Sequence, residues 1–166
     1  MIEFTVHLSL KEYQKANYTI LYKRPLAIIV TSLGVLFMCL AIAGFLFSFW
    51  LSSQDPLVNF ILGFCWCTYL PLSVYFRSKK VFASNKLMQE EVKWTVDEDS
   101  IKLQGQTYKS EFNWPGINRI QLLKDFMIIY MSKSTMYIIP RKSFHTDEEA
   151  QRLLEIAKKN NIPVIG

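Results

Sequence analysis

Two long apolar stretches dominate the pattern of hydrophobic and polar positions along the chain. Between positions 26 and 76 the only charged side chain is Asp55. A bilayer core about 30 Å thick requires roughly 20 apolar residues in a helix, so residues 26–51 and 57–76 are each long enough to cross it. The intervening SSQDP, residues 52–56, consists of turn formers, and Pro56 suits the first position of a helix. The pattern predicts a transmembrane helical hairpin over residues 25–76.

Basic side chains flank this hairpin on one side only, because the connecting turn carries Asp55 and no positive charge. Cations adjoining membrane spans favour the cytoplasmic face. We therefore expect a multi-pass protein of the bacterial inner (cytoplasmic) membrane with both termini in the cytoplasm. The residues expected to anchor it are Lys23, Arg24, Arg77, Lys79 and Lys80.

The first 24 residues predict a short strand and an interfacial helix on the cytoplasmic side. Phe4, Val6 and Leu8 alternate with polar residues, as in a half-buried strand. Ser9 and Glu12 have the spacing of a capping box, in which each caps the other's backbone at the start of a helix. Whether residues 1–9 join a sheet formed by the rest of the chain is left open by the pattern.

Residues 91–166 predict a small cytoplasmic domain, which follows a basic juxtamembrane linker with some helical character over residues 77–90. Apolar residues recur with period two in successive short segments separated by turns, which is typical of an antiparallel meander. Thr146 and Glu149 then form a second capping box ahead of an amphipathic helix. The fold class is an α+β membrane protein: a two-helix hairpin plus a small antiparallel β domain, pleckstrin-homology-like, capped by its final helix.

Composition narrows the classes of function. The net charge of +5 belongs mostly to residues 77–166, where it is spread without a dense basic run, which argues against nucleic acid as a partner. Nucleophile, phosphate-loop and metal-ligand motifs are not recognised, so we expect a protein that is not an enzyme and needs no cofactor or metal. The aromatic residues of the tail could form a ligand groove, but their alternation along strands favours the core; they are Trp94, Phe112, Trp114, Phe126, Tyr130 and Tyr137.

Three residues are candidates for a binding surface in the tail. Trp114 precedes a Pro-Gly break, which suggests a position at the domain rim. Arg141 and Lys142 follow a predicted strand, and such loop ends commonly carry binding residues. Basic side chains near a membrane attract anionic headgroups by about 1 kcal/mol each.

Three segments in order resemble the YcxB-like membrane proteins of bacteria: LSLKEYQKAN before the hairpin, then FNWPGINRI and MYIIPRKSF before the last helix. The resemblance implies a bacterial inner-membrane location and a pleckstrin-homology-like tail, and leaves the activity open. We expect the tail to bind membrane lipids, a protein partner or a second copy of the chain. The alternative is a small membrane immunity protein or a transporter accessory subunit that acts through its spans.

Overall fold

The computed structural model describes residues 1–46, 55–132 and 135–166. These residues form two compact units, one of residues 1–16 and 81–166 and the other of residues 17–80. The division predicted from the sequence has its boundaries after residues 24, 76 and 90. The first sixteen residues belong with the carboxy-terminal part of the chain, although the hairpin separates the two in sequence.

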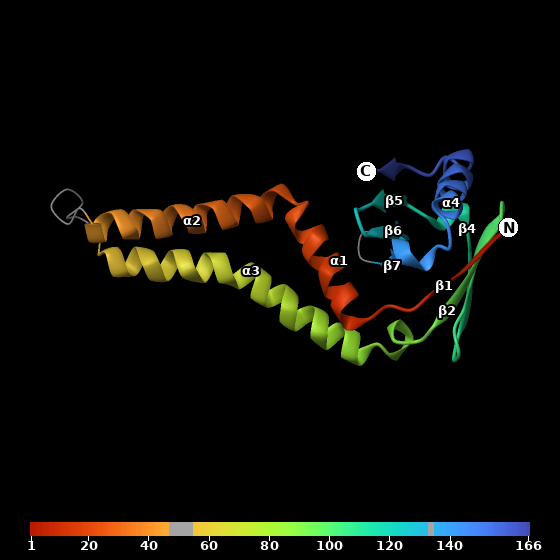
Figure 1. Cartoon of the computed structure of the whole chain (residues 1–166), viewed down its shortest axis with the longest axis horizontal. Helices are drawn as coiled ribbons and strands as arrows, with labels where there is room; N and C mark the ends of the chain where they lie inside the picture. Colours follow the sequence, from red (N-terminus) through yellow and green to blue (C-terminus); the bar gives the residue numbers. More distant parts are fainter. Residues whose placement is uncertain (47–54, 133–134) are drawn as a thin grey trace. The chain divides into compact units, whose positions relative to one another are not determined.

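The unit of residues 17–80 is a helical hairpin. Helices α2 (Pro25–Leu46) and α3 (Pro56–Ser84) lie side by side (Figure 1). Both are long and apolar enough, by length and composition, to cross a membrane. Pro56 begins α3, as expected. The last five residues of the first predicted span and residues 52–54 of the predicted turn lie outside the described residues.

Small residues bring the two long helices into close contact. A Cβ atom added at Gly63 would lie 2.7 Å from the carbonyl oxygen of Gly34 and 2.8 Å from the backbone nitrogen of Met38. Backbones approach this closely only where the side chain is absent, as at many helix contacts in membranes. Near the other end of the hairpin, the hydroxyl of Tyr18 in α1 (Leu10–Tyr22) donates to the Pro71 carbonyl oxygen at 2.9 Å.

The basic stretch after the second apolar segment continues α3 as far as Ser84. This stretch is helical, as predicted. Residues 77–84 contain no glycine or proline that would end the helix earlier. Asn85 then leads into a single 3-10 turn, η1 (Lys86–Met88). The linker therefore consists of a helix end and a short turn.

Two four-stranded sheets form the other unit. The first has the order β1-β2-β3-β4 and is antiparallel throughout. Its strands are β1 (Ile2–Val6), β2 (Val92–Val96), β3 (Ser100–Gln104) and β4 (Lys109–Asn113). The second has the order β7-β6-β5-β8, in which only the short β8 runs parallel to its neighbour. Its strands are β5 (Arg119–Leu122), β6 (Phe126–Tyr130), β7 (Met136–Pro140) and β8 (Val164–Ile165).

The amino-terminal strand is an integral part of the first sheet. Phe4 lies opposite Trp94, and Val6 lies opposite Val92. The buried positions of β1 are those that the alternation predicted, because successive side chains of a strand point to opposite faces. Residues 2–6 thus join the sheet of the tail, and the sequence had left open whether residues 1–9 do so.

Helix α4 (Asp147–Lys159) covers one end of the core (Figure 1). Its amino terminus is capped as predicted, since the backbone N–H of Glu149 donates to the Thr146 hydroxyl at 3.3 Å. The Glu149 carboxylate in turn accepts from the backbone N–H of His145 at 2.8 Å, one residue before the cap. Ala150, Leu153 and Ala157 turn inward and are buried.

Candidate functional site

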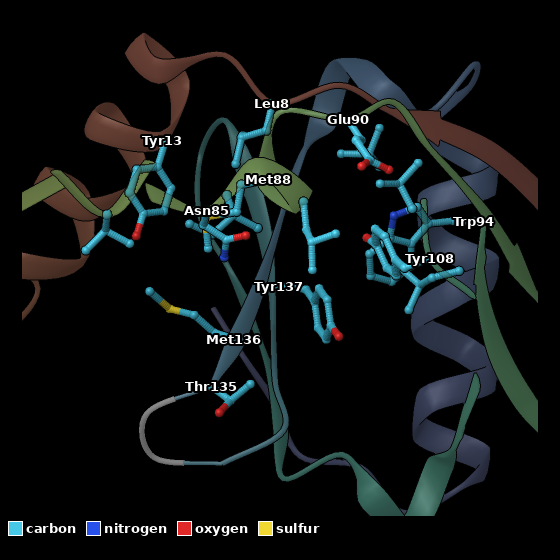
Figure 2. Close-up of a pocket in the computed structure, with 16 residues that line it drawn as sticks. Leu8, Tyr13, Asn85, Met88, Glu90, Trp94, Tyr108, Thr135, Met136 and Tyr137 are labelled. Atoms are coloured by element: carbon cyan, nitrogen blue, oxygen red, sulfur yellow. The ribbon is translucent and has the colours of Figure 1, made fainter. Parts of the chain in front are cut away.

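A partly open cavity of about 410 Å³ lies within the unit of residues 1–16 and 81–166. Its walls come from both sheets, from the segment around η1 and from the first half of α1. Figure 2 shows Tyr13, Asn85 and Met88 on one side in this view, Trp94 and Tyr108 on the other, and Tyr137 between them. We call this cavity the cleft.

The lining of the cleft is mainly apolar. Branched aliphatic side chains from β1, β2, β3 and β7 form much of it: Val6, Val92, Leu103 and Ile138. Met88 and Met136 add flexible, polarizable thioethers, which adapt their shape to a ligand at little cost. Asn85 and Thr135 contribute an amide and a hydroxyl. Such a lining suits an apolar ligand that carries a few neutral polar groups.

Aromatic rings close the side of the cleft where the two sheets meet. Tyr137 of β7 stacks on Phe112 of β4, with ring centroids 5.6 Å apart, and meets Trp94 of β2 edge-on at 5.5 Å. Aromatic pairs with such geometry add to the stability that their burial provides. Tyr108 lies beside them, and its burial, followed by the proximity of Tyr137 and Glu90, raises the pKa of its phenol.

Glu90 is the one charged residue among the described residues that line the cleft, and its carboxylate is occupied by the β3–β4 loop. It accepts from the backbone N–H groups of Gln106 at 2.9 Å and Thr107 at 3.0 Å, and also from the Thr107 hydroxyl. These bonds, that of the Thr107 hydroxyl foremost, lower the pKa of Glu90. The carboxylate therefore fixes the loop at the cleft and is already hydrogen-bonded within the protein.

Gly105 makes this arrangement possible. A Cβ atom at this position would lie 2.7 Å from Cε1 of Tyr108 and 2.8 Å from Oε2 of Glu90. Both distances are shorter than real side-chain contacts. Any larger residue would displace the tyrosine ring or the carboxylate that holds the loop.

Trp114 does not lie at the rim where the sequence suggested. It begins the 3-10 turn η2 (Trp114–Gly116), and its side chain is only 1% exposed. The indole N–H donates to the carbonyl oxygen of Asp97 at 3.2 Å, which satisfies its polar group inside the core. The Pro-Gly break turns the chain outward after the tryptophan, so the ring itself packs inward and offers no surface for a ligand.

Arg141 and Lys142 lie together on the surface, in the 3-10 turn η3 (Arg141–Ser143) after β7. The Lys142 ammonium forms an ion pair with Glu12 of α1 at 2.6 Å, so part of its charge is balanced within the unit. Glu12 also accepts from the backbone N–H and the hydroxyl of Ser9, the predicted capping box. Burial raises the pKa of Glu12, but the bonds from Lys142 and Ser9 outweigh it and leave that pKa below its usual value.

The five residues predicted to anchor the chain are all exposed. Lys23 and Arg24 lie between α1 and α2, and the other three lie on α3: Arg77, Lys79 and Lys80. Within the described residues, no group of three or more His, Cys, Asp or Glu side chains is arranged to hold a metal ion.

Comparison with known proteins finds one family with a similar sequence. The profile of the YcxB-like protein family matches residues 96–157, from the end of β2 to the last turns of α4. The uncharacterised protein YcxB of Bacillus subtilis (strain 168) is 25% identical over 107 residues. Over these residues the chain is similar to YcxB-like proteins. That alignment takes in 64% of this chain and 58% of the relative's length, and no solved structure matches the chain.

The sequence pattern pointed to some residues of the cleft but did not show that they lie together. Trp94, Phe112 and Tyr137 were singled out as residues of the core or of a groove; Trp94 and Tyr137 line the cleft, and Phe112 packs against both. Phe126 and Tyr130 are instead buried in β6. The contributions of Val6, Asn85 and Met88 were missed, because these residues come from segments that the sequence assigned to different parts of the chain.

Proposed function

We propose that this YcxB-like chain is a non-enzymatic protein of the bacterial cytoplasmic membrane that holds a binding module at the cytoplasmic face. In this proposal α2 and α3 cross the bilayer, and both ends of the chain are cytoplasmic. The exposed basic residues around the spans support the orientation, since Lys23, Arg24, Arg77, Lys79 and Lys80 contrast with Asp55 in the hairpin connection.

The insertion of the hairpin into a sheet is the observation that carries this proposal. The two apolar helices lie in the chain between β1 and β2, which are adjacent and fully paired in the first sheet. The module is therefore connected to the spans by two segments of chain rather than by one. Such a double connection restricts the module to the immediate surroundings of the spans and raises its effective concentration toward ligands there.

We also propose that the module is pleckstrin-homology-like. An antiparallel four-stranded sheet is followed in the chain by three more antiparallel strands and then by α4, whose inner face packs on the core. This order of strands and final helix is the one on which the sequence-based expectation rested. The short parallel strand β8 follows α4 as an addition.

Binding is favoured over catalysis by the chemistry of the cleft. Its described lining is mostly aliphatic and aromatic, and its carboxylate is engaged in fixing a loop. A second surface, at Arg141 and Lys142, presents cations that suit an anionic headgroup or an acidic patch of a protein partner. Arg141 is the stronger candidate of the two, because Lys142 is paired with Glu12.

Photocrosslinking from the full chain in bacterial membranes tests this surface. A photoreactive amino acid at Arg141 should capture a discrete protein, and the same residue at the exposed Lys158 of α4 should not. For the lipid arm, the full chain in nanodiscs should show slower hydrogen exchange around residues 141–144 when anionic lipid is present, at low but not at high salt. Binding at this surface would be refuted if no protein were crosslinked and if anionic lipid did not slow hydrogen exchange. In that case Arg141→Ala and the natural sequence would show the same hydrogen exchange.

A further inference from the structure

We infer that the cleft binds one acyl chain of a glycerolipid whose polar end is uncharged. The inference rests on the proposed membrane location and adds a ligand class and a site to it. The cleft is separate from the basic surface at Arg141 and Lys142, since neither residue lines it.

Size and lining fit such a chain. A cavity of about 410 Å³ falls within the range of roughly 300–1,000 Å³ that is usual for small-molecule sites. The aliphatic side chains of Val6, Val92 and Leu103 face it together with two thioethers, so an apolar chain would replace water along most of its walls. A polar solute would instead lose its hydration there with few groups to replace it.

The charges of the cleft select against an anionic head. Among its described lining residues no lysine, arginine or histidine occurs, and the only ionised group is the Glu90 carboxylate. That carboxylate stays ionised, because three hydrogen bonds from the β3–β4 loop lower its pKa. A fatty-acid carboxylate or a phosphate at the cleft would meet repulsion without a compensating cation. An ester or hydroxyl can be met by Asn85 and Thr135.

One wall of the cleft is connected directly in the chain to the second apolar segment. Val81 lines the cleft and belongs to α3, the same continuous helix that contains the second apolar segment ending at Phe76. Asn85, Leu87 and Met88 line it too and follow directly in sequence. Under the proposed membrane location, a ligand dissolved in the bilayer therefore reaches a wall of the cleft more readily than a dilute cytoplasmic solute.

Photolabelling of the full chain in phosphatidylcholine nanodiscs tests the inference. The probe is diacylglycerol with a diazirine midway along one acyl chain, and adducts are mapped by mass spectrometry. We expect adducts in residues 85–92 and 135–138, and these should decrease when unlabelled diacylglycerol is added in excess. Oleate, which is anionic, should compete less well. Adducts in the two apolar helices should not decrease, because contact with bulk lipid does not saturate.

Variants from two walls of the cleft supply the controls. Met136→Glu and Met88→Glu should each lower labelling of the cleft by about tenfold or more, since an acyl chain would then bury a charge. Met136→Leu, which keeps an apolar side chain, should retain labelling. Ile165→Glu places the same charge on an exposed apolar residue of β8 outside the cleft and should also retain it. Protease resistance of each variant establishes that the unit is folded.

The outcomes separate this inference from the proposal on which it depends. Saturable labelling that is lost in both glutamate variants supports the site. Labelled helices with an unlabelled or unsaturable cleft overturn the acyl-chain site and leave the membrane location standing. Recovery of a peptide bound in the cleft in place of the probe would likewise overturn it. Absence of label from the helices would overturn both.

Discussion

Phe4 lies directly opposite Trp94 in the pairing of β1 with β2, with their rings stacked at a centroid distance of 5.9 Å, although the whole helical hairpin separates them in the chain. Phe4 also contacts Phe144, at 4.6 Å between centroids, and is 2% exposed. Phe4 thus packs against a strand of the first sheet and against the segment that precedes α4. The fold of the tail consequently depends on a strand that precedes the two apolar helices in the chain.

The first prediction is that the hairpin can be removed but β1 cannot. Residues 1–16 joined to residues 81–166 by a short Gly/Ser linker should fold cooperatively, because Tyr13 and Phe82, near the two joined ends, already lie 5.9 Å apart between ring centroids. Residues 86–166 alone should lack the fold, since β2 would become an unpaired edge over an exposed core. Circular dichroism and urea unfolding measure both. A cooperative transition of equal midpoint in the shorter piece would contradict the prediction.

The second prediction concerns Phe4 itself. In the joined protein, Phe4→Ala should lower the free energy of unfolding by about 3–5 kcal/mol, because it leaves a cavity against Trp94 and Phe144. Thr5→Ala, on the outward face of the same strand, should change it by less than about 0.5 kcal/mol. Urea unfolding compares the two. Equal effects would mean that β1 contributes through its backbone pairing alone.

The sequence was sufficient to predict which face of β1 is buried and where two helices begin. It was not sufficient to predict which strands pair with one another. Alternation in FTVHL identified the buried side of β1, and the capping boxes at Ser9 and Thr146 located two helix starts. The alternation of apolar and polar residues in a strand does not indicate which other strand pairs with it. The pairing of Phe4 with Trp94 therefore could not be predicted. Trp114 was misplaced for a related reason: the Pro-Gly break marks a turn of the backbone and does not say to which side the preceding ring points.

The third prediction is a pH dependence that arises from Glu12. Its pKa is lower in the folded protein than its ordinary value of 4.5, so its contribution to stability is present above that value and is lost as the pH falls through the folded pKa. Glu12→Gln should therefore lower the free energy of unfolding by about 1 kcal/mol at pH 7. The difference from the natural sequence should shrink as the pH falls below 4.5.

Urea unfolding of the joined protein at a series of pH values measures this difference. Lys142→Ala should act in the same direction, because it removes the ion pair with Glu12. Glu155→Gln, at an exposed position of α4, serves as the control and should leave the curve unchanged. A Glu12→Gln difference that stays constant from neutral to acid pH would assign its effect to packing rather than to charge.

The fourth prediction concerns the contact of the two apolar helices. Gly63→Leu should separate them, because even a Cβ atom would lie within 2.8 Å of two backbone atoms of α2. Leu62→Ala removes an exposed neighbour and should have little effect. Thermal unfolding of the full chain in detergent and protease cleavage of the hairpin measure the effect. Unchanged behaviour in Gly63→Leu would rule out the close approach.

The last prediction is the topology, in which both termini lie in the cytoplasm and the hairpin connection lies outside. It follows from the position of charge, since the cations at Lys23, Arg24, Arg77, Lys79 and Lys80 all adjoin the ends of the apolar segments that are remote from Asp55. Alkaline phosphatase fused after residue 54 should be active, whereas green fluorescent protein fused at the carboxy terminus should fluoresce. Exchanging the charges tests the cause: replacing the five cations by Gln and adding lysines beside Asp55 should weaken or reverse both signals. Because β1 and β2 pair in one sheet, they must emerge on the same side of the membrane, so a reporter that placed the amino terminus opposite the carboxy terminus would contradict the two-span arrangement as well as its orientation.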